Sequence, residues 1–445
     1  MPSRRKVLAW GAAAAAGAPA LAACGESPGA ARLSAETRRR PGGKVRLVLW
    51  TWVPLQKSVA LWNRTHPDVQ VQVQIVPANT SGGYQKMHAA LKAGNPPDLA
   101  QVEYYALPEF MLVNGLTDLS GYGADRLKGS YVDWQWNQGV FGGKVYAVPQ
   151  ASGPMGFYYR KDLFERWDAD VPGTWDEFRQ AARIIRMRGG GARICSFAPA
   201  TASWFSTLVW QRGAHWIRTD PDTDTWIVDI DSKESLEVAD FWDGVIRDDL
   251  VTIMPDTQAP WYRAIQTGQL AAWISAQWGD ALLRGNAPGT KGKWRVTGLP
   301  QWEAGAHASS NYGGSSTAIL QGTRHPVEAL EFAHWLNTDP RSIDLLVAAG
   351  YGWPAARIDL KKTALGKPDP FFGGQVYNEV FQTSDRNVDT SWQWSPTTSQ
   401  SFAHIQDGIA RAIATGGTLV DALKDAQGKV VDDLRAKGLK ARSAR

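Results

Sequence analysis

The side chains with the clearest binding chemistry in this sequence are its 22 tryptophans, which outnumber the 13 phenylalanines and the 12 tyrosines. A flat indole ring with one N–H donor suits the C–H face of a sugar, where most hydroxyl groups point sideways. Burying those hydroxyls without partners costs about 1–3 kcal/mol each, so carboxylates, amides and backbone groups must lie beside the rings. The composition therefore favours a carbohydrate site, although we expect most of the tryptophans in the core or on the surface.

Sequence patterns for metal or cofactor chemistry are missing. The seven histidines are scattered, and neither H-E-x-x-H nor a cysteine cluster nor a P-loop occurs. We therefore expect no metal and no cofactor. A glycoside hydrolase would need two carboxyl groups roughly 5–10 Å apart, and the abundance of Asp and Glu leaves that alternative open.

The first 23 residues are predicted to be an export signal. Arg4, Arg5 and Lys6 precede a weakly apolar stretch from Val7 to Ala23, and no acidic residue occurs before Glu26. The segment "SRRKVL" resembles a twin-arginine signal. A run of Ala and Gly is a poor permanent membrane span, because a stable span needs about 20 strongly apolar residues. We expect residues 1–23 to be removed.

The residue that follows this stretch is predicted to carry a lipid. "LAAC", ending at Cys24, resembles the bacterial lipobox, in which the cysteine thiol receives a diacylglyceryl group and becomes the new N-terminus. Two or more acyl chains anchor a protein firmly where one is marginal. We expect residues 24–43 to be a lipidated tether that holds the chain on the outer face of the cell membrane. An ordinary cleaved signal with a chance cysteine is the alternative.

Charge and cysteine content narrow the possible partners. The net charge falls from +5 to +2 when the three cations of the signal are removed, and only Arg38–Arg40 form a basic cluster. A nucleic-acid partner is therefore not expected. If Cys24 is lipidated, Cys195 has no partner for an intramolecular disulfide, and we expect it to be a buried small hydrophobe. A mature chain of about 400 residues implies two domains, and we expect a monomer.

The elements that must position a site begin with an alternating α/β pattern. Strands are predicted at "KVRLVLWTW" (44–52) and "VQVQVQIV" (69–76), with a helix to about residue 66 between them. A helix near 84–92 and a short strand at 99–103 follow. This order predicts a parallel half-sheet. Ligands bind beyond the carboxyl ends of such strands, which places Trp50–Trp52 and Glu103–Tyr105 at a cleft rim.

The second half of the sequence predicts another helical block and two crossings between halves. Thr174 and Glu177 form a capping box for a helix that ends at Gly189–Gly191. Extended segments with Gly and Pro occur at 142–164 and 294–305. Two crossings predict discontinuous lobes that can hinge. We expect lobe I to comprise residues 44–152 and 300–352, and lobe II to comprise residues 153–299 and 353–445.

The order of these segments resembles the extracellular solute-binding proteins of the carbohydrate-uptake class that includes maltose-binding protein. The resemblance rests on collinear segments, among them "LWTW", "AGNPPDLAQV", "GGKVYAVPQ", "YYRKDLF", "PGTWDEF", "TGQLAAWISAQW" and "NYGGSSTAI". It implies an α/β fold of the periplasmic-binding-protein type, with two lobes, each a sheet flanked by helices, joined by hinge strands. It also implies capture of a sugar or oligosaccharide between the lobes, delivery to the permease of an ABC transporter, and no chemistry on the ligand.

The resemblance also nominates ligand-binding residues. Trp278, at the end of "AAWISAQW", is the leading candidate for stacking on a sugar. Maltose-binding protein has a carboxylate in its crossover where this chain has "QASG", so maltose itself is in doubt. A polyamine or another non-sugar solute on the same fold is an alternative ligand. The full set of expected ligand-binding residues is Trp52, Glu103, Tyr104, Gln150, Ser152, Trp204, Trp278, Tyr312, Gly314, Trp353 and Trp394.

Overall fold

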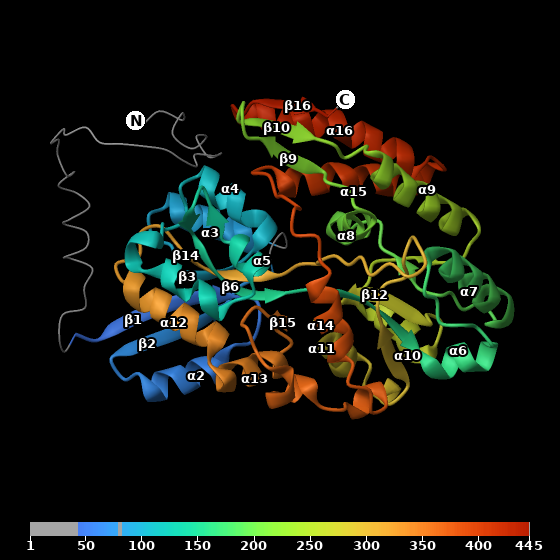
Figure 1. Ribbon diagram of the computed structural model, residues 1–445, viewed down its shortest axis with the longest axis horizontal. Helices are drawn as coiled ribbons and strands as arrows, with labels where there is room; N and C mark the ends of the chain where they lie inside the picture. The colour runs from blue at the N-terminus through green and yellow to red at the C-terminus, as the bar shows by residue number, and fades with distance from the viewer. Residues whose placement is uncertain (1–42, 79–81, 445) are drawn as a thin grey trace.

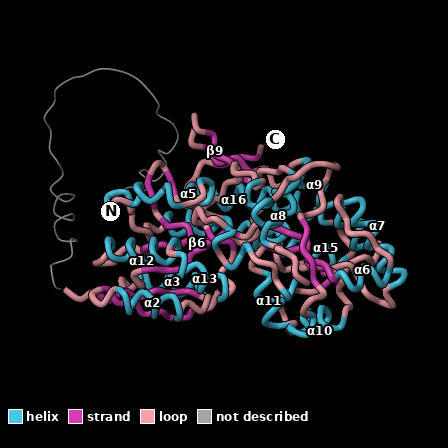
Figure 2. The backbone as a smooth tube through the Cα atoms, turned by 60° about the horizontal axis from the view of Figure 1, so that its bottom comes forward, coloured by secondary structure: helices cyan, strands magenta, loops and turns pink. Residues whose placement is uncertain are grey.

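The computed structural model describes residues 43–78 and 82–444, so the predicted export signal, Cys24 and nearly all of the tether lie outside the described residues. The described chain forms two lobes that lie side by side along the longest axis of the molecule (Figures 1 and 2). Each lobe is built around its own β-sheet with helices packed on both faces. The predicted two-lobed α/β fold is confirmed.

Lobe I contains a six-stranded sheet in the order β15-β6-β14-β3-β1-β2. Strand β1 runs parallel to both β2 and β3, which confirms the predicted parallel half, whereas β14 runs antiparallel to β3 and β6. The elements of this lobe are β1 (Val45–Thr51), α2 (Gln56–Thr65), β2 (Val69–Ile75), α3 (Gly83–Lys92), β3 (Leu99–Glu103), η3 (Tyr104–Ala106), α4 (Leu107–Leu112), η4 (Ser120–Tyr122), η5 (Ala124–Ser130), α5 (Asp133–Asn137), β4 (Val140–Phe141), β5 (Lys144–Val145), β6 (Ala147–Ser152), β14 (Ser315–Ile319), α12 (Pro326–Thr338), α13 (Pro340–Ala348) and β15 (Trp353–Pro354).

The core of lobe I follows from the alternation of side chains along β1. Leu47 and Leu49 face the cluster that includes residues of α2 and α12, whereas Val48 and Trp50 face the cluster built with α3 and α4. Successive residues of a strand point to opposite faces, so an apolar run without alternation must be covered on both sides. The sheet therefore lies between two layers of helices. The ends of its strands remain available to form a binding site.

Lobe II is centred on a three-stranded sheet in the order β12-β7-β13, with a second sheet in the order β16-β10-β9 and the parallel pair β8-β11. Its elements are β7 (Met155–Arg160), α6 (Lys161–Trp167), α7 (Trp175–Arg188), β8 (Ser196–Phe197), α8 (Ala202–Arg212), β9 (Ile217–Asp220), β10 (Thr225–Val228), α9 (Lys233–Arg247), β11 (Thr252–Ile253), α10 (Ala259–Thr267), β12 (Ala272–Ala276), α11 (Gly279–Asn286), η6 (Pro288–Thr290), β13 (Trp294–Thr297), η7 (Leu360–Lys362), η8 (Ala364–Gly366), η9 (Pro370–Phe372), α14 (Asn378–Arg386), α15 (Thr398–Thr415), α16 (Leu419–Ala436) and β16 (Ala441–Ser443).

The structure of lobe II confirms two local predictions, the capping box at Thr174 and the burial of Cys195. The Thr174 hydroxyl accepts from the Glu177 amide at 3.2 Å, and the Glu177 carboxylate accepts from the Thr174 amide at 3.1 Å, which is the predicted capping box of α7. Phe178 and Ile185 of the same helix are fully buried. Cys195 is also buried, as expected, and burial raises the pKa of its thiol.

Two of the segments that cross between the lobes lie next to each other. The Tyr312 amide donates to the Gly153 carbonyl at 2.8 Å, and the Gly153 amide donates to Asn311 Oδ1 at 2.7 Å. A side chain at Gly153 would overlap the carbonyl oxygen of Tyr312, so only glycine allows this approach. The paired crossings form a short, narrow connection, which is the geometry of a hinge.

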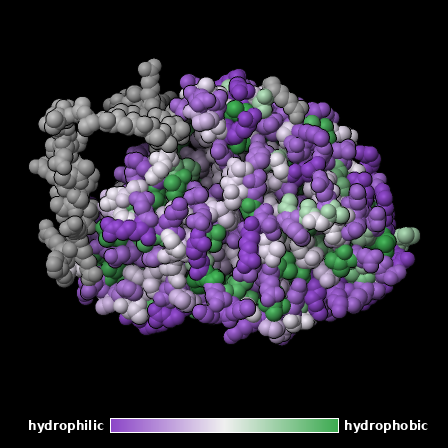
Figure 3. Space-filling model, viewed as in Figure 1, coloured by the Kyte–Doolittle hydropathy of each residue, from purple (hydrophilic) through white to green (hydrophobic). Residues whose placement is uncertain are grey.

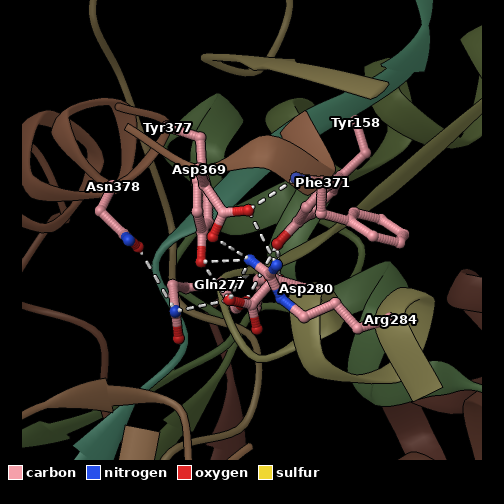
Figure 4. A network of polar contacts seen from close by, with 9 residues as sticks. Tyr158, Gln277, Asp280, Arg284, Asp369, Phe371, Tyr377 and Asn378 are labelled. Carbon is pink, nitrogen blue, oxygen red and sulfur yellow. Dashed lines mark hydrogen bonds and ion pairs between the residues drawn. The ribbon is translucent and has the colours of Figure 1, made fainter. Parts of the chain in front are cut away.

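The chain crosses between the lobes a third time after β15 (Trp353–Pro354), and a network of ion pairs and hydrogen bonds fastens the segment that follows to lobe II (Figure 4). Arg284 of α11 makes two hydrogen bonds to Asp369, at 2.9 and 2.7 Å, and a third to the Tyr377 hydroxyl at 3.3 Å. Tyr377 in turn donates to Asp280 of α11. Burial raises the pKa of the Asp280 carboxyl to about 6. Residues 369–378 therefore belong to lobe II.

The strand pairing places the edges of the lobes differently from the expected limits at 300 and 352. Gln301 bridges Thr174 of lobe II, and the Trp302 ring lies 5.9 Å from the ring of Trp175, so residues 300–310 pack on lobe II. Strand β15 pairs with β6 and belongs to the sheet of lobe I. The limits of the lobes are hard to predict from sequence, because the extended residues between the lobes pair with residues that are distant in the chain.

The outer surface is mainly hydrophilic on the face drawn in Figure 3, where apolar residues form small separate groups. Among the described residues, no helix combines the length and apolar character that a membrane crossing needs.

Candidate ligand-binding site

The candidate site lies where strand ends of both lobes meet the crossing at 311–314. Trp52 follows β1 and Glu103 ends β3, both in lobe I, whereas Trp278 follows β12 in lobe II. A methyl group built on Gly313 would lie 3.7 Å from Trp278 Nε1 and 3.9 Å from Glu103 Oε1. One point above the crossing is thus within 4 Å of polar atoms from both lobes.

Trp278 is held in a defined orientation at this point. Its indole N–H donates to the Tyr312 carbonyl at 3.0 Å, and the Tyr312 ring centroid lies 5.1 Å away at an interplanar angle of 55°. Trp278 also meets Trp273 edge to face, with ring centroids 6.0 Å apart. The Trp278 side chain stays partly exposed. A partly exposed ring held in a fixed orientation is the arrangement that stacking on a sugar requires.

Glu103 is the carboxylate of lobe I at the site, and two tyrosines hold it. Tyr84 of α3 donates to Glu103 Oε2 at 3.1 Å and accepts from the Glu103 amide at 2.9 Å. Burial and the nearby Glu103 carboxylate together raise the pKa of the Tyr105 phenol. Trp52 meets the Tyr84 ring edge to face at 6.3 Å. Trp52 and Glu103 are therefore parts of one wall.

Lobe II adds two polar residues that the sequence analysis did not find, Asp256 and Ser203. Burial raises the pKa of the Tyr312 phenol well above its usual value, and the charges of Asp256 and Glu103 raise it further, while a hydrogen bond with Ser203 lowers it. Asp256 accepts a hydrogen bond from the Trp273 indole at 3.2 Å, and burial raises the pKa of the Asp256 carboxyl. Tyr312 therefore lies near carboxylates from both lobes.

Ser203 and Asp256 both lie beyond the carboxyl ends of two parallel strands. Ser203 comes after β8 and Asp256 comes after β11, and these strands are parallel. Their carboxyl ends share one edge, which is where ligands bind in such sheets. The signal was missed because each strand has only two residues and shows no periodicity.

Three further expected residues lie directly beneath the site, namely Gly314, Tyr104 and Ser152. Gly314 has φ +88, and a methyl group there would lie 3.1 Å from the Tyr104 ring and 3.2 Å from the Ser152 Cα. Tyr104 and Ser152 are buried. The Ser152 hydroxyl donates to Asp385 of α14 at 3.3 Å. Tyr104 and Ser152 support the crossing, so their side chains are not exposed toward a ligand.

Three expected residues lie inside the lobes. Gln150 accepts from Thr317 at 3.2 Å within the sheet of lobe I. The Trp204 indole donates to the Ile274 carbonyl at 3.0 Å in the core of lobe II. Trp353 is buried on strand β15, with 4% of its surface exposed. Ser203 and Trp204 show why sequence misplaces such residues, since adjacent residues of one element face different environments.

Trp394, the remaining candidate, bridges the lobes at a different place. Its indole donates to Gln138 of lobe I at 3.1 Å, and its ring lies 6.1 Å from that of Tyr105. Most other tryptophans are core residues, and fifteen in the described chain are buried. The partly exposed ones are Trp52, Trp226, Trp278, Trp302, Trp335 and Trp394.

The described part of the chain contains no group of three or more His, Cys, Asp or Glu side chains arranged to hold a metal ion. The polar groups at the crossing are carboxylates, hydroxyls, an indole N–H and backbone groups, all of which can pair with ligand hydroxyls or amines.

Two hinged lobes with aromatic and acidic side chains at their junction define a protein that binds a small solute. The family model for bacterial extracellular solute-binding proteins matches residues 53–340, and the chain belongs to this family. Members of the family are extracytoplasmic binding proteins.

Some similar proteins are named for the sugars that they bind. The arabinooligosaccharide-binding protein of Halalkalibacterium halodurans is 23% identical over 86% of this chain and 88% of its own length. The lactose-binding protein of Rhizobium radiobacter is 24% identical over 75% of this chain and 81% of its own length.

Solved structures superpose on nearly the whole described chain. The galacto-N-biose/lacto-N-biose I-binding protein of the ABC transporter from Bifidobacterium longum, in complex with lacto-N-biose, gives a TM-score of 0.82 at 30% identity, covering 90% of this chain and 100% of that one. The ABC transporter-associated binding protein from B. animalis subsp. lactis, in complex with β-1,6-galactobiose, gives 0.79 at 26% identity with the same coverage.

Proposed function

We propose that this protein captures a sugar or short oligosaccharide at the junction of its lobes and delivers it to the permease of an ABC importer, without changing it chemically. The observation that carries the proposal is the ring of Trp278, held by Tyr312 at the crossing beside the carboxylate of Glu103. The ring supplies an apolar surface, and the carboxylates of Glu103 and Asp256 accept from hydroxyls that would otherwise lose their partners.

The lobes provide a reason for coupling between binding and closure. Glu103 and Trp52 belong to lobe I, whereas Trp278, Asp256 and Ser203 belong to lobe II. A ligand that touches both sets gains all its contacts only when the lobes approach, so it shifts the population toward the closed form by this difference in affinity. The closed form is then the signal that a permease can recognise.

The similar proteins support a carbohydrate ligand. Arabinooligosaccharides, lactose, lacto-N-biose and β-1,6-galactobiose are named for relatives that align with most of this chain. These relatives are binding proteins, which supports a non-enzymatic role. We infer that the ligand here is built of hexose or pentose units whose axial C–H bonds form apolar faces.

A polyamine is the second candidate, because two carboxylates flank the aromatic rings. The carboxylates of Asp256, in lobe II, and Glu103, in lobe I, both raise the pKa of the Tyr312 phenol. Negative charge from both lobes therefore lies near Tyr312. An extended diamine would pair its ammonium groups with these carboxylates and stack its methylene groups on Trp278. Spermidine and putrescine therefore belong in every binding screen.

We also propose that the mature chain is a monomer anchored outside the cell by a lipid on Cys24. The sequence around Cys24 and the family's extracellular location support the anchor. A lipoprotein of Streptomyces antibioticus is 28% identical over 139 residues, which is 30% of this chain.

A thermal-shift screen followed by calorimetry tests the function. Lacto-N-biose, β-1,6-galactobiose, lactose, arabinooligosaccharides, putrescine and spermidine are added to the mature protein without its tether. A specific ligand at one hundred times its Kd stabilises the protein by about 2.7 kcal/mol, and the melting temperature rises. A rise with saccharides alone supports the proposal. A rise with polyamines alone assigns the second candidate, and release of reducing ends at an enzyme-limited rate identifies a hydrolase.

A further inference from the structure

The two lobes meet directly along a group of aromatic rings that we call the aromatic seam, formed by Tyr105, Trp394 and Phe402. The ring centroid of Tyr105, in lobe I, lies 6.1 Å from that of Trp394 and 5.4 Å from that of Phe402, both in lobe II. The Trp394 and Phe402 centroids are 6.3 Å apart. All three pairs have edge-to-face or near-perpendicular geometry, which is favourable for aromatic rings in contact.

Hydrogen bonds between the lobes flank the aromatic seam. The Trp394 indole donates to Gln138 Oε1 at 3.1 Å, and the Ser399 hydroxyl donates to Glu109 Oε2 at 3.0 Å. In both bonds the donor belongs to lobe II and the acceptor to lobe I. The His88 ring lies behind Glu109, with Nε2 3.4 Å from Glu109 Oε1. The seam is therefore a specific contact with its polar groups paired.

The rings behind the seam belong to the core of lobe II. Trp394 meets Trp210 edge to face at 6.0 Å, and Trp210 is stacked on Trp392 at 4.9 Å with an interplanar angle of 13°. Helix α15, which carries Phe402, packs on α8 and α16 (Figure 1). It also contacts η3 of lobe I. The lobe II side of the seam is therefore supported by buried neighbours.

The aromatic seam is linked both to the candidate site and to a groove. Tyr84 donates to the Glu103 carboxylate of the candidate site, and Tyr105 of the seam lies beside the same carboxylate. Glu109 and Ser399, whose hydrogen bond flanks the seam, line a groove of about 610 Å³. Residues of both lobes line this groove, both apolar ones such as Leu112 and Val113 and charged ones such as Lys92 and Lys437.

We propose that the aromatic seam limits the length of the saccharide that this protein accepts, because it closes the candidate site on the side of the groove. This inference rests on the proposed function. A chain that extends past Glu103 must separate the rings and break the two interlobe hydrogen bonds before it reaches the groove. A disaccharide that ends at Glu103 leaves the seam intact, so short saccharides bind more tightly than their longer homologues.

Calorimetry with a length series tests this inference on the mature protein without its tether. The probes are β-1,6-linked galacto-oligosaccharides and arabinooligosaccharides, each from the disaccharide to the pentasaccharide. We expect the wild type to lose about tenfold or more in affinity between its best short member and the pentasaccharide, since the loss of a packed aromatic contact is of this size.

Phe402→Ala removes one ring of the seam and leaves the residues of the candidate site unchanged. It is expected to reduce the length penalty to about threefold or less while the affinity for the short member stays within about twofold. Phe141→Ala is the matched control, because Phe141 is also a partly buried ring in contact with a tyrosine but lies outside the seam. Its centroid is 6.4 Å from that of Tyr146 at an interplanar angle of 59°. The control is expected to keep the full penalty.

Each outcome of the length series has a separate meaning. Equal affinity of the wild type for short and long members, or the same penalty in Phe402→Ala as in the wild type, overturns the inference and leaves the proposed function standing. Binding of no saccharide by the wild type overturns the proposed function and the inference with it. Circular dichroism melting of Phe402→Ala verifies that the variant is folded. If Phe402→Ala does not fold, Ser399→Ala, which removes only a hydroxyl, replaces it as the variant that weakens the seam.

Discussion

The indole of Trp278 is tied to the backbone of the crossing by a 3.0 Å hydrogen bond to the carbonyl oxygen of Tyr312. The bond joins the end of a lobe II strand to the segment that returns to lobe I. The orientation of the ring therefore depends on the position of the hinge, and any ligand that stacks on the ring senses both lobes.

Trp278→Ala is expected to weaken saccharide binding by about tenfold or more, because it removes the stacking surface. Trp278→Phe keeps a ring but loses the N–H donor, so its affinity should fall between those of the wild type and the alanine variant. Calorimetry measures both, and circular dichroism checks the fold. Trp226→Ala, on the separate β9-β10-β16 sheet, is the control. Unchanged affinity of Trp278→Ala would remove Trp278 from the site.

Gly314→Ala is expected to destabilise the protein more than Gly305→Ala. Both glycines have positive φ, +88 and +79, so each alanine carries a backbone cost of about 1–2 kcal/mol. At Gly314 the new methyl also meets the Ala151 carbonyl at 3.1 Å, whereas nothing lies within 4 Å at Gly305. Overpacking of this kind adds about 1–3 kcal/mol. Urea denaturation measures the free energy of unfolding of both variants. Equal losses of this free energy would show that the crossing accommodates the extra methyl group without an energetic penalty.

The buried carboxyl of Asp385 is expected to make stability depend on pH. Asp385 accepts from Ser152 Oγ and from Gln135 Nε2, each at 3.3 Å, and burial raises its pKa to about 6. In the unfolded chain the pKa is about 3.9, so the native state binds more protons between about pH 4 and pH 6. The contribution of this group is fully present below about pH 4 and is lost as the pH rises through about 6.

Asp385→Asn should therefore flatten the decrease in melting temperature with rising pH across this range. Melting curves at several pH values for the wild type and the variant measure the slope. Asp407→Asn is the control, because Asp407 is exposed on α15. Asp280, whose pKa burial also raises to about 6, contributes a slope of the same sign in both proteins. An unchanged slope in Asp385→Asn would place the linked protons elsewhere.

Cys24→Ser is expected to release the protein from the membrane fraction, because a serine cannot receive the diacylglyceryl group. The product should be either an uncleaved precursor or a soluble form, distinguished by mass. Wild-type protein labelled with a radioactive fatty acid provides the positive control. A cleaved Cys24→Ser form that stays in the membrane would contradict lipidation.

The local elements of the fold were predictable because their signals are local. The apolar run of β1, the strict alternation of β2 and the capping box of α7 each lie within a few residues, and each element occurs where it was predicted. The rule that ligands bind beyond the ends of parallel strands also placed Trp52 and Glu103 together at the edge of the lobe I sheet.

Part of the site depended on contacts between residues far apart in sequence. Trp204 and Ser203 are neighbours on α8, but only Ser203 reaches Tyr312, because the ring of Trp204 packs under β12. Asp256 follows a strand too short to recognise, and the Tyr105 ring of the seam meets residues almost 300 positions later in the chain.

The sequence by itself determined the α/β class, the order of elements, the family resemblance and the tryptophan-rich composition that favours a sugar. Only the tertiary structure decided which rings are buried, which carboxylates meet at the crossing and where the lobes touch. The physical reason is that periodicity and capping act over one or two turns of chain, whereas the direction of a side chain is selected by the partners that packing brings to it.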